Sequence, residues 1–364
     1  MKTGCIIHAY VSLCKWRIPL FAAMTAAAGF FLTARSGGKT LLFLTVGTFL
    51  LACGAAAFNQ YREWRTDARM PRTAGRPLPS KRVPPVSALL MSAALMAAGG
   101  MVLLLTGSPA VVLLGLAAVL WYDLVYVWLK TRSSFAVIPG ALIGAIPPAM
   151  GWIAGGGDFL DPRMAALCFF VFMWQVPHFF THLLVFGKEY EAAGLPSLTA
   201  LLKPAQLERL TFHWLLAAAI SLQLVNVNGM ILSGTIRLSL LAASLWIVIR
   251  GFSLLRGNTE QYKLVFKGIN TFIFIILLLM CLDKLPFRFG AVQKSFSLQR
   301  SLRHMIISNH QFDADSEMRK ISASPLLNRF SPESAPGGKI KRHDATPCTD
   351  KKQEKIGCIP TQLP

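Results

Sequence analysis

Nine long apolar segments dominate this chain up to about residue 285 and restrict what it can fold into. A helix needs roughly 20 residues to cross the hydrocarbon core of a bilayer. The apolar residues are continuous rather than alternating, which favours helices over barrel strands. We therefore predict an all-α membrane protein, with transmembrane helices at about 18–34, 41–58, 86–106, 109–128, 136–155, 164–185, 210–228, 233–250 and 266–282.

The basic residues indicate how these helices are oriented. A net charge of +20 would suggest nucleic acid binding in a soluble protein, but here most Lys and Arg lie between the apolar segments, so we expect no nucleic acid partner. Most are at the N-terminus and after the second, fourth, sixth and eighth segments, and only Arg35, Lys39, Arg163 and Arg237 lie on the opposite side. The positive-inside rule then places the N-terminus and these loops in the cytoplasm of a bacterial-type inner membrane.

The C-terminal region differs in composition from the rest. Residues 287–364 are rich in Ser, Pro, Lys and Arg, so we expect a disordered tail after a membrane domain at 1–286. The seven cysteines show no CxxC spacing, which argues against a zinc site or a disulfide framework.

A cluster of polar residues follows the second segment. Asn59, Glu63 and Asp67 are spaced i, i+4, i+8, so a helix would place their oxygen atoms on one face. Amide and carboxylate oxygens are ligands that Mg²⁺ accepts. Pro71 should end the helix, and the turn that follows carries Arg72 and Arg76, whose guanidinium groups match phosphate oxygens.

A second polar loop, after the sixth segment, falls on the same side of the membrane. Its Glu189 would face the first cluster and complete a predicted metal-binding and catalytic set of Asn59, Glu63, Asp67 and Glu189. Two metal ions could then clamp a diphosphate and neutralise charge on the leaving group. The cationic side chains Lys130, Arg132 and Lys188 lie on the same side and are predicted, with the two arginines, to bind that diphosphate.

Polar residues also occur at membrane depth in the sixth segment, around Trp174, Gln175 and His178. Such residues tend to face a cavity or the bundle interior. His178 and His182 share a helical face and could ligate haem iron or a metal, orient a substrate carboxylate, or form bonds within the bundle. In the fifth segment, Gly140 and Gly144 predict close helix packing, and Pro147-Pro148 predicts a break in the helix.

These motifs resemble the UbiA-type intramembrane prenyltransferases. The run from Asn59 through Asp67 to Arg76-Pro77-Leu78 is similar to the first signature of that family. Four further stretches resemble the haem O synthase (protohaem IX farnesyltransferase) branch, and they begin at Lys15, at Gly140 (GALIGAIPPAMGW), at Trp174 and at Glu189. The likeness runs in order from about 12 to 285.

The resemblance implies a bundle of nine transmembrane helices around a central cavity, with Mg²⁺ as cofactor. It implies transfer of a farnesyl group from farnesyl diphosphate to the vinyl group of protohaem IX, giving haem O. Membrane lipid, and haem A synthase or terminal oxidase assembly, would be partners. The residues predicted to bind the acceptor are Trp174, Gln175, His178 and Tyr190.

The chain departs from the family pattern at two acidic positions, because Glu63 and Glu189 stand where Asp is usual. Each change moves a carboxylate outward by one methylene, which matters for a metal as demanding in geometry as Mg²⁺. Three alternatives stay open: a prenyltransferase for a quinone precursor or another aromatic acceptor, a transporter, and a haem-binding protein without catalysis.

Overall fold

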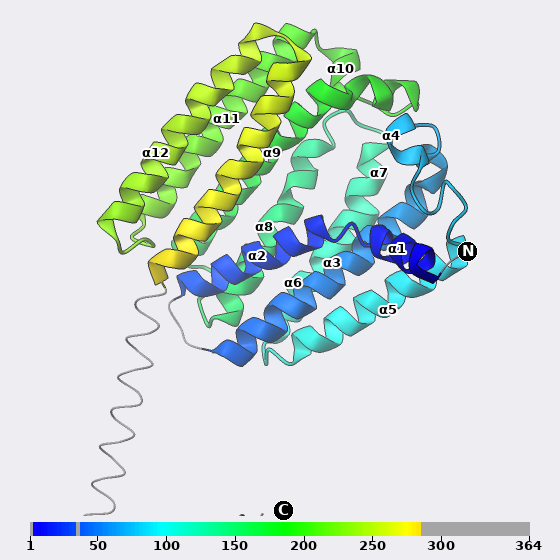
Figure 1. The fold of residues 1–364 in the computed structure, drawn as a ribbon. Helices are drawn as coiled ribbons and strands as arrows, with labels where there is room; N and C mark the ends of the chain where they lie inside the picture. Colours follow the sequence, from blue (N-terminus) through cyan, green and yellow to red (C-terminus); the bar gives the residue numbers. More distant parts are fainter. Residues whose placement is uncertain (1–2, 34–36, 285–364) are drawn as a thin grey trace, which may run out of the picture. The chain divides into compact units, whose positions relative to one another are not determined.

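The computed structural model describes residues 3–33 and 37–284, and within these ranges the chain forms helices and turns with no β-strand (Figure 1). The predicted tail lies outside the described residues. The helices are α1 (Thr3–Leu13), α2 (Arg17–Leu32), α3 (Gly38–Asp67), α4 (Pro71–Ala74), α5 (Pro85–Leu104), α6 (Pro109–Leu120), the π-helical turn η1 (Trp121–Tyr126), α7 (Val127–Lys130), α8 (Val137–Ala154), α9 (Pro162–Ala192), α10 (Leu198–Leu201), α11 (Pro204–Val227), α12 (Gly234–Gly251), the 3₁₀ turn η2 (Phe252–Arg256) and a last helix over Thr259–Lys284.

The predicted membrane architecture is confirmed. Within the described ranges, eight helices are long and apolar enough to cross a membrane, with α6, η1 and α7 together forming one of them. The shorter apolar helix α2 corresponds to the remaining predicted segment. Large apolar side chains such as Leu90, Leu113 and Leu245 are exposed on the outside of the bundle, where lipid would cover them.

Two helices extend beyond the predicted transmembrane segments, and both extensions carry the polar motifs. The second predicted segment stops at residue 58, whereas α3 continues to Asp67. The sixth stops at residue 185, whereas α9 continues to Ala192. The helical position predicted for the first motif is therefore confirmed, whereas Glu189, predicted in a loop, lies at the end of a helix.

The predicted break at Pro147-Pro148 is wrong, because α8 runs unbroken from Val137 to Ala154. The two prolines lack N–H donors, so two helical hydrogen bonds are lost. Tight packing on α2 holds the helix together instead: a Cβ on Gly29 would lie 2.1 Å from the carbonyl oxygen of Pro148. One turn further on, a Cβ on Gly151 would lie 1.8 Å from the carbonyl oxygen of Ala26.

The predicted packing role of the other two glycines is confirmed. A Cβ on Gly140 would lie 2.6 Å from the ring of Tyr126, and one on Gly144 would lie 1.8 Å from Oε1 of Gln175. Both glycines therefore let α8 approach side chains of the neighbouring helices.

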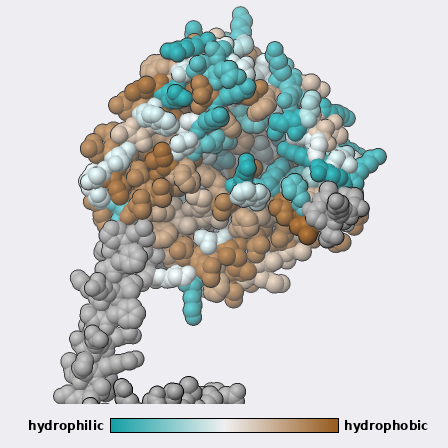
Figure 2. Space-filling view, in the orientation of Figure 1, coloured by the Kyte–Doolittle hydropathy of each residue, from teal (hydrophilic) through white to brown (hydrophobic). Residues whose placement is uncertain are grey.

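The polar segments gather at one end of the bundle. In Figure 1, α4, α7 and α10 lie at the same end, although long stretches of sequence separate them. Figure 2 shows hydrophilic side chains concentrated over that end and apolar ones over the body of the bundle. Both predicted polar loops therefore reach the same side of the molecule.

Candidate active site

The first polar motif lies at the end of α3 and in the turn that follows. Asn59 and Asp67 are buried, and Glu63 between them is partly buried. The helix ends at Asp67, whose carbonyl oxygen accepts a hydrogen bond from the Thr73 hydroxyl at 2.8 Å. Pro71 begins the short helix α4, a position where its missing N–H costs nothing. The predicted turn thus contains one helical turn, which carries Arg72.

Asp67 is paired with an arginine of its own motif. Nη1 of Arg76 lies 2.6 Å from Oδ2 of Asp67, and the Asp67 side chain is almost fully buried. Ion-paired hydrogen bonds of this length are among the stronger ones in proteins. The pair fixes the Arg76 guanidinium beside the end of α3.

Glu63 is paired across the bundle with the end of α7. Nζ of Lys130 donates to both carboxylate oxygens of Glu63, at 3.0 and 3.2 Å. Both side chains are partly buried. This contact places Lys130, predicted to bind diphosphate, directly against the first acidic motif.

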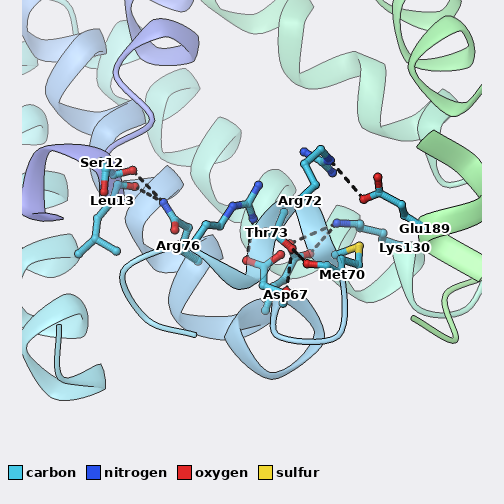
Figure 3. A network of polar contacts seen from close by, with 11 residues as sticks. Ser12, Leu13, Asp67, Met70, Arg72, Thr73, Arg76, Lys130 and Glu189 are labelled. Atoms are coloured by element: carbon cyan, nitrogen blue, oxygen red, sulfur yellow. Dashed lines mark hydrogen bonds and ion pairs between the residues drawn. The ribbon is translucent and has the colours of Figure 1, made fainter. Parts of the chain in front are cut away.

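Glu189 brings the second polar loop to the first. Nε of Arg72 lies 3.7 Å from Oε2 of Glu189, and the Arg72 guanidinium lies over the Phe186 ring at 5.1 Å. That Glu189 oxygen is buried and has no hydrogen-bond partner within the described residues. Figure 3 shows Asp67, Arg72, Arg76, Lys130 and Glu189 together in one network.

The acids contact cations of the chain, not one another. Within the described residues, no group of three or more His, Cys, Asp or Glu side chains is arranged to hold a metal ion. The predicted set of Asn59, Glu63, Asp67 and Glu189 stays a prediction, with its three acids paired to cations in this structure. The donors still fit Mg²⁺ chemically, because this ion is commonly held by one or two carboxylates with substrate phosphates and water completing the shell. Oε2 of Glu189, which has the Arg72 ion pair but no hydrogen bond within the described residues, is one oxygen for that role.

Lys15, which is not among the predicted binding residues, also lies near this network. It lies between α1 and α2 with a positive φ of 46°. Nearby, Nε2 of Gln60 holds the end of α1 by donating to the carbonyl oxygens of Ser12 and Leu13 at 3.2 and 2.8 Å.

The acidic and basic residues of the site determine the electrostatic environment of Lys15. Burial, followed by the charge of Arg76, lowers the pKa of Lys15 to about 8, while Glu63 acts in the opposite direction. The available sequence signals were the position of Lys15 just before the first predicted span and the family-like stretch that begins with it.

Two predicted diphosphate-binding residues lie outside the network. Arg132 is exposed and its guanidinium lies over the Trp128 ring at 4.4 Å. Lys188 is exposed as well. The structure therefore brings together Arg72, Arg76 and Lys130 from the predicted cationic set.

A cavity opens beside Lys130 and extends between α7, α9 and the start of α10. Its lining includes Tyr126, Lys130, Phe179, His182 and Tyr190. Nζ of Lys130 lies 5.7 Å from the centre of the Tyr190 ring, and the His182 and Tyr190 rings are 6.2 Å apart. The cavity therefore has a cationic end next to the acidic motif and aromatic walls beyond it.

The other predicted acceptor residues take different positions. Trp174 is buried and its indole N–H donates to the carbonyl oxygen of Ile269 at 3.0 Å, a packing role. The His178 ring lies 5.0 Å from Phe266, and its Nδ1 is buried without a hydrogen-bond partner in the described part of the chain. Oε1 of Gln175 is likewise buried and unpartnered there. Of the four, Tyr190 lines the cavity.

Comparison with known proteins gives consistent matches. Residues 18–278 match the model of the UbiA prenyltransferase family. The chain is 32% identical over 280 residues to the protoheme IX farnesyltransferase of Oleidesulfovibrio alaskensis, covering 77% of this chain and 98% of that protein. It is 37% identical over 217 residues to the protein of the same name from Geobacter sulfurreducens, covering 59% and 79%.

Solved structures share the fold at low sequence identity. A digeranylgeranylglyceryl phosphate synthase superimposes with a TM-score of 0.63 at 14% identity, covering 77% of this chain and 99% of that one. A UbiA homologue from Archaeoglobus fulgidus bound to GPP and Mg²⁺ gives a TM-score of 0.60 at 14% identity, with the same coverage. At these identities the likeness shows the fold alone.

Proposed function

Because the chain belongs to the UbiA prenyltransferase family, we propose that it transfers a farnesyl group from farnesyl diphosphate to the vinyl group of protohaem IX, giving haem O. The names of the similar relatives support this choice of transferred group and acceptor. The observation that carries the proposal is the network in which Glu63, Asp67 and Glu189 each hold a cationic side chain at one end of the bundle.

In this proposal the network is a diphosphate site in its resting form. Lys130, Arg76 and Arg72 are held in place by carboxylates, so they are oriented before the substrate arrives. An entering diphosphate would take over these cations, as phosphate oxygens bind guanidinium and ammonium groups well. Lys15 would add a further positive charge from the joint between α1 and α2.

The released carboxylates would then hold the metal. Asn59, Glu63, Asp67 and Glu189 supply amide and carboxylate oxygens, the donor types that Mg²⁺ accepts. When bound, Mg²⁺ supplies positive charge that stabilises the departing diphosphate. The exchange of partners explains how the same residues serve both resting and loaded forms.

The C1 atom of the farnesyl chain would lie beside Lys130, at the cationic end of the network, with the chain extending between the helices of the bundle. The C1–O bond breaks with its electron pair passing to diphosphate, and C1 forms a bond to the terminal vinyl carbon of protohaem. Water adds to the other vinyl carbon and loses a proton, which gives the hydroxyethylfarnesyl group. The aromatic walls of Tyr126, Phe179 and Tyr190 would limit the access of water to the cationic centre before that step.

The membrane setting follows from the same proposal. We place the protein in a bacterial-type inner membrane with its N-terminus and the acidic network on the cytoplasmic side, because basic residues concentrate there. Farnesyl diphosphate and protohaem would both reach the site from that side or from lipid. Association with haem A synthase or with terminal oxidase assembly would hand on the product.

The test is direct. Purified protein supplied with farnesyl diphosphate, protohaem and Mg²⁺ should give a product with the mass of haem O. The same reaction with a quinone precursor as acceptor is the control for specificity. A prenylated quinone precursor, with no haem-linked product, would contradict the proposed acceptor while leaving the family reaction in place.

A further inference from the structure

A carboxylate outside the recognised acidic motifs lies buried in the membrane part of the bundle. Asp123 is 2% exposed and sits in the π-helical turn η1, between α6 and α7. Both of its carboxylate oxygens are buried and lack a hydrogen-bond partner within the described residues. Buried polar groups in proteins are normally satisfied, and π-helical turns occur frequently at functional sites. The Asp123 carboxylate is therefore a candidate for binding a ligand.

The surroundings of Asp123 belong to the first acidic motif. Nη1 of Arg62 donates to the backbone carbonyl oxygen of Asp123, so this guanidinium is used on the main chain and not on the carboxylate. Arg62 precedes Glu63 on α3. Of the charged groups, Arg62, Glu63 and Lys15 are near enough to act on the Asp123 carboxyl group.

The chemical class of the ligand follows from these neighbours. A phosphate group would set its own acceptor oxygens against the two carboxylate oxygens of Asp123, which likewise only accept hydrogen bonds. An apolar group would leave the two carboxylate oxygens unsatisfied. A divalent cation would satisfy both oxygens and offset the proximity of the two acids.

We propose that Asp123 is a ligand of a divalent cation that it shares with Glu63 and Asn59. This inference rests on the proposed function, which brings Mg²⁺ and diphosphate to the end of α3. Asn59 is buried one helical turn before Glu63 on the same helix, so its amide oxygen belongs to the same face. Two carboxylates and one amide leave coordination positions for phosphate oxygens and water.

The assignment also accounts for the longer side chain at position 63. Glu63 is held by Lys130 in the resting form, and α3, which carries Glu63, contacts η1. Asp123 supplies a second carboxylate there, on the helix segment that also carries Lys130. Asp123 and Lys130 are seven residues apart on this segment, about two helical turns, and Lys130 contacts Glu63.

The test measures metal binding without turnover. Full-length protein in detergent is loaded with an unreactive thiodiphosphate analogue of farnesyl diphosphate and titrated with Mn²⁺, and free Mn²⁺ is followed by its electron paramagnetic resonance signal. Asp123→Asn should weaken Mn²⁺ binding by about 10- to 100-fold. Asp123→Glu should retain much of the affinity because it keeps the carboxylate. Asp158→Asn, in the loop between α8 and α9 at the opposite end of the bundle, should bind as the wild type does.

The outcomes separate this inference from the proposed function. If wild-type protein binds Mn²⁺ tightly and Asp123→Asn and Asp123→Leu bind it equally well, Asp123 is a buried neutral carboxyl group and the inference is overturned. If the wild type binds no Mn²⁺ with the analogue present, the metal part of the proposed function fails first. If Asp123→Asn does not fold, thermal stabilisation by Mn²⁺ is compared in Asp123→Leu and Asp123→Glu. Stabilisation that is lost in Asp123→Leu and kept in Asp123→Glu supports the inference. Equal stabilisation of both variants overturns it.

Discussion

Arg72 and Glu189 lie 3.7 Å apart between Nε and Oε2, which joins the turn after α3 to the end of α9. The two residues belong to the two polar motifs and are far apart in the sequence. Their contact is the physical link between a predicted phosphate-binding turn and a predicted metal ligand. It also leaves the Glu189 oxygen without a hydrogen bond among the described residues, so the pair can separate at modest cost.

Replacing Arg72 tests whether this link serves the substrate. Arg72→Gln removes one cation from the diphosphate site, and we expect kcat/KM for farnesyl diphosphate to fall by about 10- to 100-fold, the loss of a charged hydrogen bond. Steady-state kinetics on the purified protein measure the change. The matched control is Arg163→Gln at the other end of α9, where the arginine also pairs with an acid, Asp161, and lies over the Trp152 ring. Equal losses in both variants would point to a general effect on stability.

The pair of Glu63 and Lys130 should behave as a coupled unit. Removing one partner leaves a partly buried charge without its counterion, so Glu63→Gln and Lys130→Met should each destabilise the protein. The double variant loses both charges together. We therefore expect a coupling free energy of about 1–2 kcal/mol in a double-mutant cycle of unfolding in mixed micelles. Strictly additive effects would mean that the ion pair contributes little to the fold.

Lys15 should make substrate binding depend on pH. Its pKa is lowered to about 8, so in the free protein its ammonium group loses its proton as the pH rises through 8. The KM for farnesyl diphosphate should therefore rise between pH 7 and pH 9, by up to about tenfold for one charged contact. Lys15→Arg keeps the charge throughout this range and should flatten the profile. If KM depends on pH in the same way in both proteins, Lys15 is not part of the substrate site.

The lowered pKa of Lys15 also predicts how the stability of the protein depends on pH. Because the pKa of Lys15 is lower when folded than its ordinary value of 10.5, the unfolded chain binds more protons between these two pH values. The contribution of Lys15 to the free energy of unfolding should then increase as the pH rises from about 8 toward 10.5. The difference in the free energy of unfolding between wild-type protein and Lys15→Met, measured across this pH range, gives the contribution of Lys15.

The close contact of α2 with α8 should be sensitive to one methyl group. A Cβ at Gly151 would lie 1.8 Å from the carbonyl oxygen of Ala26, so Gly151→Ala must push the two helices apart. We expect a loss of about 1–3 kcal/mol and a lower melting temperature in detergent. Gly100→Ala in α5 meets nothing within 4 Å and should leave stability unchanged or slightly raised. Similar melting temperatures for the two variants would show that the contact relaxes freely.

The sequence by itself determined the helical membrane bundle and the residues that could carry chemistry. Apolar length is a local property, so nine spans could be predicted from runs of residues alone. The spacing of Asn59, Glu63 and Asp67 likewise follows from helix geometry within one element.

Only the tertiary structure decided which residues meet. Whether Glu63 contacts a metal, another acid or Lys130 depends on where a distant helix ends, and no local pattern contains that distance. The same holds for Asp123, which reads in sequence as one acid in an apolar run and becomes significant only when its unpartnered oxygens lie near Glu63. Helix α8 shows why local patterns can fail to predict structure. Its two prolines tend to break a helix, but packing against Gly29 and Ala26 overrides that tendency.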